Sequence, residues 1–347
     1  MKLVVLGLTL SSSWGNGHAT TFRALLRAFA ARGHEVLFLE RDKPWYAANR
    51  DLAEPDFCRL EYYASVAGLE RWRDEIVQAD AVIVGSYVPE GVAVGAWAQA
   101  TAPGRCCFYD IDTPVTLAKL AAGDFEYLTP ELIPGYATYF SFTGGPTLAR
   151  LERQYGSPRA RPLYCSVDTT RYRPLPVTKR WDLTYLGTYS DDRQPTLDRL
   201  LLAVARACPE RSFAVAGPQY PATIDWPANV ERIEHLPPAD HPAFYSASRF
   251  TLNVTRADMI AAGWSPSVRL FEAGACACPI ISDRWEGIET VMAGIHLADT
   301  TGDVIAALAE DATDAGESAR CSVLAHHTAA VRAAELEADL AALTEMA

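Results

Sequence analysis

The sequence has little of what a nucleic-acid-binding or membrane protein needs. Its 347 residues include 31 Lys and Arg against 43 Asp and Glu, and the net charge is -12. Phosphate backbones and anionic membranes are bound by clustered basic side chains, so we expect neither as a partner. No apolar run approaches the roughly 20 residues of a membrane-spanning helix, and residues 1–7 are typical of a strand rather than a secretory signal. We therefore expect a cytoplasmic protein with no nucleic-acid partner and no integral membrane segment.

Metal-site and disulfide patterns are missing as well. The chain has 8 cysteines, but no pair of them has the CxxC spacing and none has the Cys/His spacing of a zinc site. Several of these cysteines stand among apolar or small residues. We predict buried free thiols and no metal site.

Strands and amphipathic helices alternate along the chain instead. Short apolar runs predict strands over Lys2–Leu10, Glu35–Leu39, Ala81–Gly85, Arg105–Tyr109, Trp181–Gly187, Ser212–Gly217, Val230–His235, Phe250–Val254 and Pro279–Ser282. Helical spacing of apolar residues predicts a helix over His18–Ala31. This alternation is typical of parallel sheets covered by helices on both faces.

A proline-rich, irregular stretch over residues 167–180 divides the alternation into two series. We predict a first α/β domain over residues 1–166, a hinge or linker over 167–180 and a second α/β domain over 181–347. The last helical segment, 329–344, either covers the second sheet or crosses back to the first domain. In doubly wound domains ligands bind at the carboxyl ends of the strands.

Residues 263–283 combine a loop, a helix start and a buried strand. Ser265 is a good N-cap with proline after it, so the free N–H groups of the helix are able to face an anion. Arg269 and Glu272 are three residues apart and fall on one helical face. A guanidinium for phosphate oxygens thus stands beside a carboxylate that accepts from ribose hydroxyls. The alternative is an ordinary surface ion pair.

Arg193 ends the loop that follows the first strand of the second series, just before Pro195 opens a helix. That position is the carboxyl end of a strand. Arginines and helix N-termini are the groups that stabilise the negative charge of a phosphate where no Mg²⁺ is bound. Arg193 suits this role, and the alternative is a surface arginine at a helix start.

The first strand is followed by a loop of small residues, Gly15, Asn16 and Gly17. His18 then begins a helix, where the positive end of the dipole favours a neutral imidazole that accepts a proton. This makes His18 a candidate base. The alternative for this loop and helix end is cradling a phosphate or capping.

Asp110 and Asp112 follow the apolar run Arg105–Tyr109, so they also lie at a strand's carboxyl end. A general base must take the proton of an attacking hydroxyl, and Asp112 is a candidate equal to His18. Asp110 is a further candidate. Asp112 precedes Thr-Pro, so its alternative role is that of a turn or capping residue.

Two of these segments resemble a known family. Residues 17–36 resemble the opening of GT-B glycosyltransferases, and residues 267–282 are similar to the donor-binding helix of their CgeB-like branch. The resemblance implies two facing Rossmann-like doubly wound domains with an interdomain cleft. It also implies that the second domain mainly holds a nucleoside-diphosphate sugar and the first an acceptor, with no required cofactor or metal ion.

The resemblance assigns further roles. Glu272 corresponds to the ribose-binding carboxylate, and the backbone at His235 and Leu236 to the place where the base is held. The start of the donor helix contributes three more donor-binding residues, Ser265, Ser267 and Val268. Retaining members often carry a Glu-x7-Glu pair, but Trp264 stands here at the first position, which leaves the stereochemistry open.

We therefore expect a glycosyltransferase, hexosyltransferase-like, with a small molecule, a glycan or a protein as acceptor. A nucleotide-sugar-binding or scaffolding protein without turnover and a nucleotide-sugar epimerase of the same fold remain alternatives. A dinucleotide oxidoreductase is a weaker one: Glu40 ends the second strand as such a site needs, but Thr20 occupies the third glycine position of the fingerprint.

Overall fold

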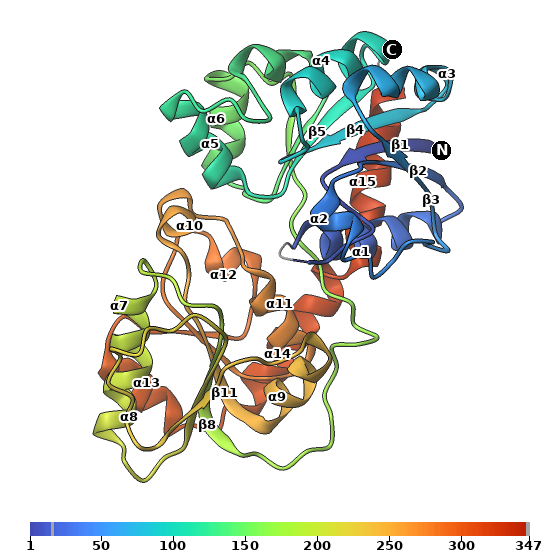
Figure 1. Cartoon of the computed structure of the whole chain (residues 1–347). Coiled ribbons are helices and arrows are strands. Elements are labelled where there is room, and N and C mark those ends of the chain that lie inside the picture. The colour runs from blue at the N-terminus through green and yellow to red at the C-terminus, as the bar shows by residue number, and fades with distance from the viewer. Residues whose placement is uncertain (15–16, 345–347) are drawn as a thin grey trace. The chain divides into compact units, whose positions relative to one another are not determined.

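The computed structural model describes residues 1–14 and 17–344. The chain forms two compact units, which are described separately (Figure 1). The first contains residues 1–166 together with the helix α15 (Ala329–Thr344), and the second contains residues 167–328.

The first unit is built on a seven-stranded parallel sheet in the order β3-β2-β1-β4-β5-β6-β7. Its strands are β1 (Lys2–Gly7), β2 (Glu35–Arg41), β3 (Arg59–Tyr63), β4 (Ala81–Gly85), β5 (Cys106–Asp110), β6 (Tyr139–Ser141) and β7 (Ala160–Pro162). Its helices are α1 (His18–Ala30), α2 (Pro44–Ala47), α3 (Arg73–Val77), α4 (Gly91–Thr101), α5 (Thr113–Ala122), α6 (Pro146–Arg153) and α15, with 3₁₀ turns at Val66–Trp72 and Pro130–Gly135.

Both faces of this sheet are buried, which explains its almost continuous apolar strands. On β1, Leu3 and Val5 face the core cluster that includes α1 and α15, whereas Val4 and Leu6 face the cluster on the opposite side. Helix α15 packs against α1, with Leu340 fully buried in the first cluster (Figure 1). The last helix therefore belongs to the first unit, although it follows the whole of the second in sequence.

The second unit has a six-stranded parallel sheet in the order β10-β9-β8-β11-β12-β13. Its strands are β8 (Trp181–Leu186), β9 (Phe213–Ala216), β10 (Val230–Ile233), β11 (Ser248–Asn253), β12 (Ile280–Ser282) and β13 (Ile295–Leu297). Its helices are α7 (Gln194–Leu197), α8 (Ala203–Ala207), α9 (His241–Ala247), α10 (Ala257–Ala262), α11 (Val268–Ala275), α12 (Ile288–Val291), α13 (Thr301–Leu308) and α14 (Thr313–His326), with a π-helical turn at Asp198–Leu202 and a 3₁₀ turn at Pro238–Asp240.

The fold class predicted from the sequence is confirmed, since both units are parallel-sheet, Rossmann-like α/β structures. The first strand ends at Gly7 rather than Leu10. The backbone N–H groups of Leu10 and Ser11 donate to the Glu40 carboxylate at 2.7 and 2.9 Å, which draws the chain out of the sheet. The three-residue strands β6, β7 and β13 and the edge strand β3 were not predicted.

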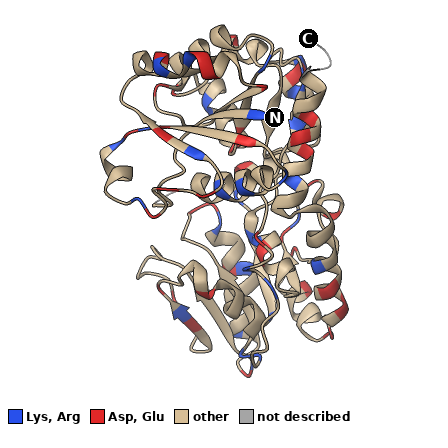
Figure 2. Ribbon diagram, turned by 90° about the vertical axis from the view of Figure 1, so that its right-hand side faces the viewer, with Lys and Arg blue, Asp and Glu red and all other residues tan. Residues whose placement is uncertain are grey.

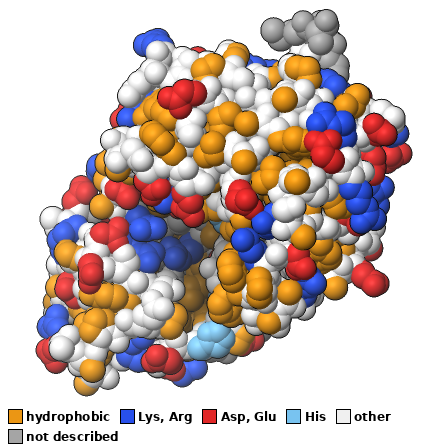
Figure 3. Space-filling view, turned by 45° about the horizontal axis from the view of Figure 1, so that its top comes forward, with side chains coloured by type: hydrophobic (Ala, Val, Ile, Leu, Met, Phe, Trp, Pro, Cys, Tyr) orange, Lys and Arg blue, Asp and Glu red, His pale blue; other side chains and the backbone are white. Residues whose placement is uncertain are grey.

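Acidic and basic side chains occur in both units (Figure 2). On the face drawn in Figure 3, basic side chains form small groups among acidic and apolar ones. All 8 cysteines are free, and all are buried except Cys58, which is half-buried, and Cys321, which is exposed. In the described part of the chain, no helix combines the length and apolar character needed to cross a membrane.

We predict that Leu340→Ala destabilises the first unit by about 2–5 kcal/mol, because it leaves a cavity between α15 and α1. Amide hydrogen exchange should show lost protection in α1. Leu324→Ala, at a position that is 39% exposed on α14, is the matched control and should change stability by less than about 0.5 kcal/mol. Unchanged exchange in α1 would contradict the assignment of α15 to this unit.

Candidate functional site

Helix α11 starts beside the carboxyl ends of two neighbouring strands. The Asn253 amide nitrogen, at the end of β11, donates to the hydroxyl of Ser282, the last residue of β12, at 2.9 Å. The Asn253 amide oxygen accepts from the hydroxyl of Ser267 at 2.9 Å. One buried amide thus holds both strand ends and the residue that precedes α11.

The helix begins later than the sequence predicts. It starts at Val268 with Ser267 as N-cap, and no side chain caps it, so the predicted N-cap at Ser265 is wrong. The reason is a tight turn with positive φ at Trp264, whose N–H donates to the Glu286 carbonyl at 2.6 Å. The chain leaves this turn extended up to Ser267, and Ser265 is buried there.

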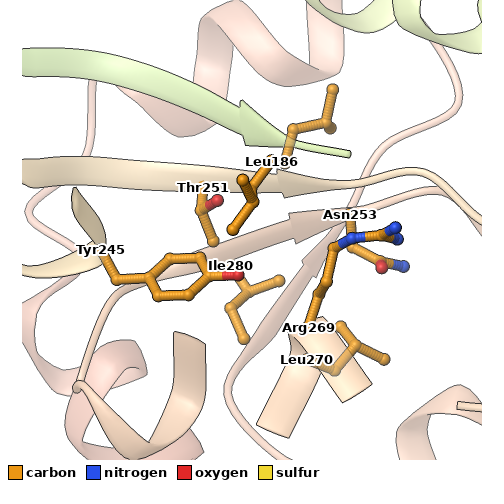
Figure 4. A pocket seen from close by; sticks show the side chains of 8 residues that line it. Leu186, Tyr245, Thr251, Asn253, Arg269, Leu270 and Ile280 are labelled. Carbon is orange, nitrogen blue, oxygen red and sulfur yellow. The ribbon is translucent and has the colours of Figure 1, made fainter. Parts of the chain in front are cut away.

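Two arginines lie close together at this edge of the second sheet. Arg193 follows β8 and stands at the N-cap of α7, whereas Arg269 rises from α11 beside Asn253 (Figure 4). Burial and the nearby charge of Arg269 lower the pKa of Arg193. Arg193 Nη2 donates to the Thr188 carbonyl at 2.7 Å. Among the described residues neither arginine has an ion-pair partner, and Arg193 Nε is buried without a hydrogen bond. Such a pair of neighbouring guanidinium groups is suited to binding an anion.

Glu272 lies one turn along α11 from Arg269, but within the described chain the two form no ion pair. The alternative of an ordinary surface pair therefore does not hold here. The Tyr245 hydroxyl contacts Glu272 Oε2 at 3.5 Å, and His241 Nδ1 lies 3.8 Å from the same oxygen. Burial and the Glu272 charge raise the pKa of Tyr172, whose hydroxyl also reaches this carboxylate. Glu272 is thus bordered by hydroxyl and imidazole groups rather than by a cation.

The other predicted donor residues are distributed around this centre. His235 is exposed beyond the end of β10, and Val268 is 39% exposed at the start of α11. The Leu236 carbonyl accepts from His241 Nε2 at 3.3 Å. Asn253, Tyr172, Tyr245 and His241 were missed from the sequence.

The cavity beneath Arg269 is small. Its volume is about 10 Å³, the room of about one water molecule, and its lining includes Tyr245, Thr251, Asn253 and Ile280 (Figure 4). This cavity is therefore too small to hold a nucleotide.

In the first unit, Gly15 and Asn16 lie outside the described residues. Gly17 is the N-cap of α1, and His18 is its first residue. The ring of Tyr87 packs edge-on against the His18 imidazole, with 5.3 Å between the ring centres. Burial lowers the pKa of His18 to about 4, and in the described chain Nδ1 is buried without a hydrogen-bond partner. The imidazole is therefore neutral at neutral pH.

Tyr87 brings the two candidate bases together. Its hydroxyl donates to Asp112 Oδ2 at 3.4 Å, while its ring contacts His18. Tyr87 has a positive φ of 61°, which is rare for a residue with a side chain and concentrates at functional sites. Asp112 is the N-cap of α5 but forms no side-chain cap hydrogen bond.

Asp110 has a different environment. Its Oδ2 accepts from the Tyr139 hydroxyl at 2.5 Å and its Oδ1 from the Thr116 hydroxyl at 2.8 Å. It is fully buried, and this burial raises its pKa to about 6. Both carboxylate oxygens are engaged, so Asp110 holds β5, β6 and α5 together.

Glu40, the acidic residue of the oxidoreductase alternative, is also fully buried. Its Oε2 accepts from the N–H groups of Leu10 and Ser11, and its Oε1 accepts from the Ser11 hydroxyl at 2.7 Å. This carboxylate anchors the loop after β1, which leaves it unsuited to bind a ribose.

The chain has the two Rossmann-like units of the GT-B class of fold, which solved structures with the same fold also show. Residues 193–338, which contain the arginine pair and Glu272, match a family described as "Glycosyl transferase-like". No curated protein matches the chain.

Several solved structures share the fold over the whole chain. Sucrose-phosphate synthase from Thermosynechococcus elongatus is 14% identical with a TM-score of 0.67, and the similarity covers 100% of both chains. Anabaena HepE in complex with UDP is 13% identical with a TM-score of 0.72, covering 99% of this chain and 100% of the other. A glycosyltransferase from Rickettsia africae ESF-5 is 10% identical with a TM-score of 0.70, covering 100% of both. At these identities the similarities show a shared fold.

The lowered pKa of His18 predicts a pH-dependent stability. An unfolded histidine titrates near ~6.5, so the unfolded chain binds more protons than the folded one between that pH and about 4. The His18 contribution to the free energy of unfolding is therefore lost as the pH falls through this window.

Urea unfolding of the unmodified protein and of His18→Gln at pH 7 and pH 4.5 checks this. The variant should lose less stability on acidification. His326→Gln, at an exposed position, controls for the loss of one histidine. Equal losses in His18→Gln and the unmodified protein would contradict the burial of a neutral His18.

Proposed function

We propose that the chain transfers a sugar, of the hexose type, from a nucleoside-diphosphate sugar to an acceptor hydroxyl without a metal ion, as a CgeB-like member of the GT-B glycosyltransferases. The observation that carries this proposal is the pair Arg193 and Arg269, two neighbouring guanidiniums with no acidic partner among the described residues. Arg269 lies one helical turn from Glu272 on α11. The match of residues 193–338 to a glycosyl transferase-like family supports it.

In this proposal the second unit binds the donor. Arg193 and Arg269 bind the diphosphate and neutralise the charge that develops on it as the glycosidic bond breaks. Glu272 accepts hydrogen bonds from the ribose hydroxyls, and the backbone around His235 and Leu236 holds the base. HepE has been solved with UDP and with UDP-glucose, so a uridine nucleotide is the first donor type to test.

The N-terminus of α11 adds to the anion site. Ser267 and Val268 bring the unpaired N–H groups of this helix to the same edge as Arg269. Guanidinium and helix N–H groups together supply the positive charge that a Mg²⁺ ion supplies in other transferases, which is why the proposal requires no metal.

The first unit activates the acceptor. A base must take the proton of the attacking hydroxyl, and His18 and Asp112 are the two candidates, both in contact with Tyr87. His18 is neutral at neutral pH and so able to accept a proton, because burial holds its pKa at about 4. Asp110 positions this region through its contacts with Tyr139 and Thr116.

The arginine pair gives the first test. Arg193→Ala and Arg269→Ala should each weaken UDP binding, measured by calorimetric titration with a metal chelator present, by roughly tenfold or more, since each removes charged hydrogen bonds to the diphosphate. Arg206→Ala, which removes a half-exposed arginine on α8, is the matched control and should bind UDP normally. The proposal fails for the uridine nucleotide if the unmodified protein binds no UDP, and the arginine roles fail if both variants bind it as tightly.

Turnover tests the candidate bases. Replacing the true base by alanine should lower the rate of sugar transfer about 10²- to 10⁴-fold while donor affinity is kept. Single His18→Ala and Asp112→Ala variants, assayed by release of nucleoside diphosphate, decide between the two. Full activity in both variants would refute the base assignment, and donor binding without any turnover in the unmodified protein would favour a binding protein.

A further inference from the structure

His241 connects three parts of the second unit. It is the first residue of α9, and its Nε2 donates to the carbonyl of Leu236 at 3.3 Å. Its Nδ1 lies 3.3 Å from the hydroxyl of Tyr172 and 3.8 Å from Glu272 Oε2. The imidazole therefore lies between the segment proposed to hold the base and the carboxylate proposed to hold the ribose.

The hydrogen-bond partners of His241 determine which ring nitrogen carries the proton of the neutral imidazole. A carbonyl only accepts, so the contact with Leu236 places the proton of the neutral ring on Nε2. Nδ1 then carries a lone pair and accepts from the Tyr172 hydroxyl. In this tautomer His241 has no proton to give to Glu272.

The Tyr172 hydroxyl has a single proton and two acceptors within reach, His241 Nδ1 and the Glu272 carboxylate. When the imidazole accepts the hydrogen bond of this hydroxyl, the lone pairs of the carboxylate remain available to another donor. The only other described hydroxyl against Glu272 Oε2 is that of Tyr245, at a long 3.5 Å.

We propose that His241 is a positioning residue that sets the preference of the donor site for ribose. Held by the Leu236 carbonyl, its imidazole accepts a hydrogen bond from the Tyr172 hydroxyl, which leaves Glu272 open to ribose hydroxyls. This inference rests on the proposed function, in which Glu272 binds the ribose. The burial of the cluster agrees with such a role. The side chains of His241 and Glu272 are only 16% and 14% exposed, and polar groups are retained at such depth only when they are paired.

The experiment compares UDP with 2′-deoxy-UDP and 3′-deoxy-UDP by calorimetric titration. The unmodified protein should prefer UDP roughly tenfold or more over at least one deoxy analogue, because a hydrogen bond to a charged group is lost. In His241→Ala this preference should fall to about threefold or less, through weaker binding of UDP and little change for the deoxy analogue. His326→Ala, at an exposed position on α14, is the matched control and should keep the full preference.

Tyr172→Phe provides a second variant that removes one hydroxyl and no ring, which keeps the test valid if His241→Ala unfolds. It removes the hydroxyl that would otherwise bind Glu272, so this variant should keep its preference for UDP, and a lost preference would contradict the inference. Melting temperatures of all variants verify folding.

The outcomes separate the inference from the proposed function. If the unmodified protein binds UDP and prefers it over a deoxy analogue, but folded His241→Ala keeps that preference, the role of His241 is refuted and the donor site stands. If the variants lose affinity for UDP and for the deoxy analogues equally, His241 is only structural. If the unmodified protein binds none of the three nucleotides, the uridine donor fails and this inference with it.

Discussion

The side chain of Asn253 is the constraint on which the proposed donor site depends. A parallel sheet ends its strands at one edge, and helices that begin there bring unpaired N–H groups and side chains to the same place. Asn253 makes this edge specific, because its amide bonds Ser282 on the next strand and Ser267 before α11. With the start of α11 fixed by these bonds, Arg269 and Glu272 extend from successive turns of the same helix. Thr255 and Asp283 extend the same buried network, as Thr255 donates to both oxygens of the Asp283 carboxylate.

The second constraint is electrostatic. Most arginines on this acidic chain have a carboxylate within reach, as Arg180 has Glu231 and Arg249 has Asp182. Arg193 and Arg269 differ, since they lie close together and, among the described residues, no acid pairs with either; burial and the charge of Arg269 lower the pKa of Arg193. Keeping two such groups together costs free energy, which a bound diphosphate would offset. Glu272 forms no ion pair with Arg269 among the described residues. Its carboxylate is bordered by Tyr172, Tyr245 and His241.

Much of this was predictable from local patterns. The apolar runs of β4 and β8 and the helical spacing in α1 predicted their elements almost to the residue, because strands buried on both faces have few polar residues. The placement of Arg269 and Glu272 on one face follows from their spacing. The cap at Ser265 was wrong because the positive φ of Trp264 depends on a hydrogen bond to the distant Glu286. His241 and Tyr172 reach Glu272 from 31 and 100 residues away, and no local pattern carries such a contact. The packing partner of α15 was equally undecided, since an apolar stripe does not specify which sheet it covers.

The measurement that tests the central claim most directly is the share of the affinity that comes from the diphosphate. Calorimetric titration of the unmodified protein with uridine, UMP and UDP, in the presence of a chelator, measures this share on one base. If Arg193 and Arg269 form a diphosphate site, affinity should rise with each phosphate, and UDP should bind at least ~100-fold more tightly than uridine, in keeping with charged hydrogen bonds to both phosphates. Equal affinities for UDP and uridine, or binding of UDP that appears only when a divalent metal is added, would contradict the account.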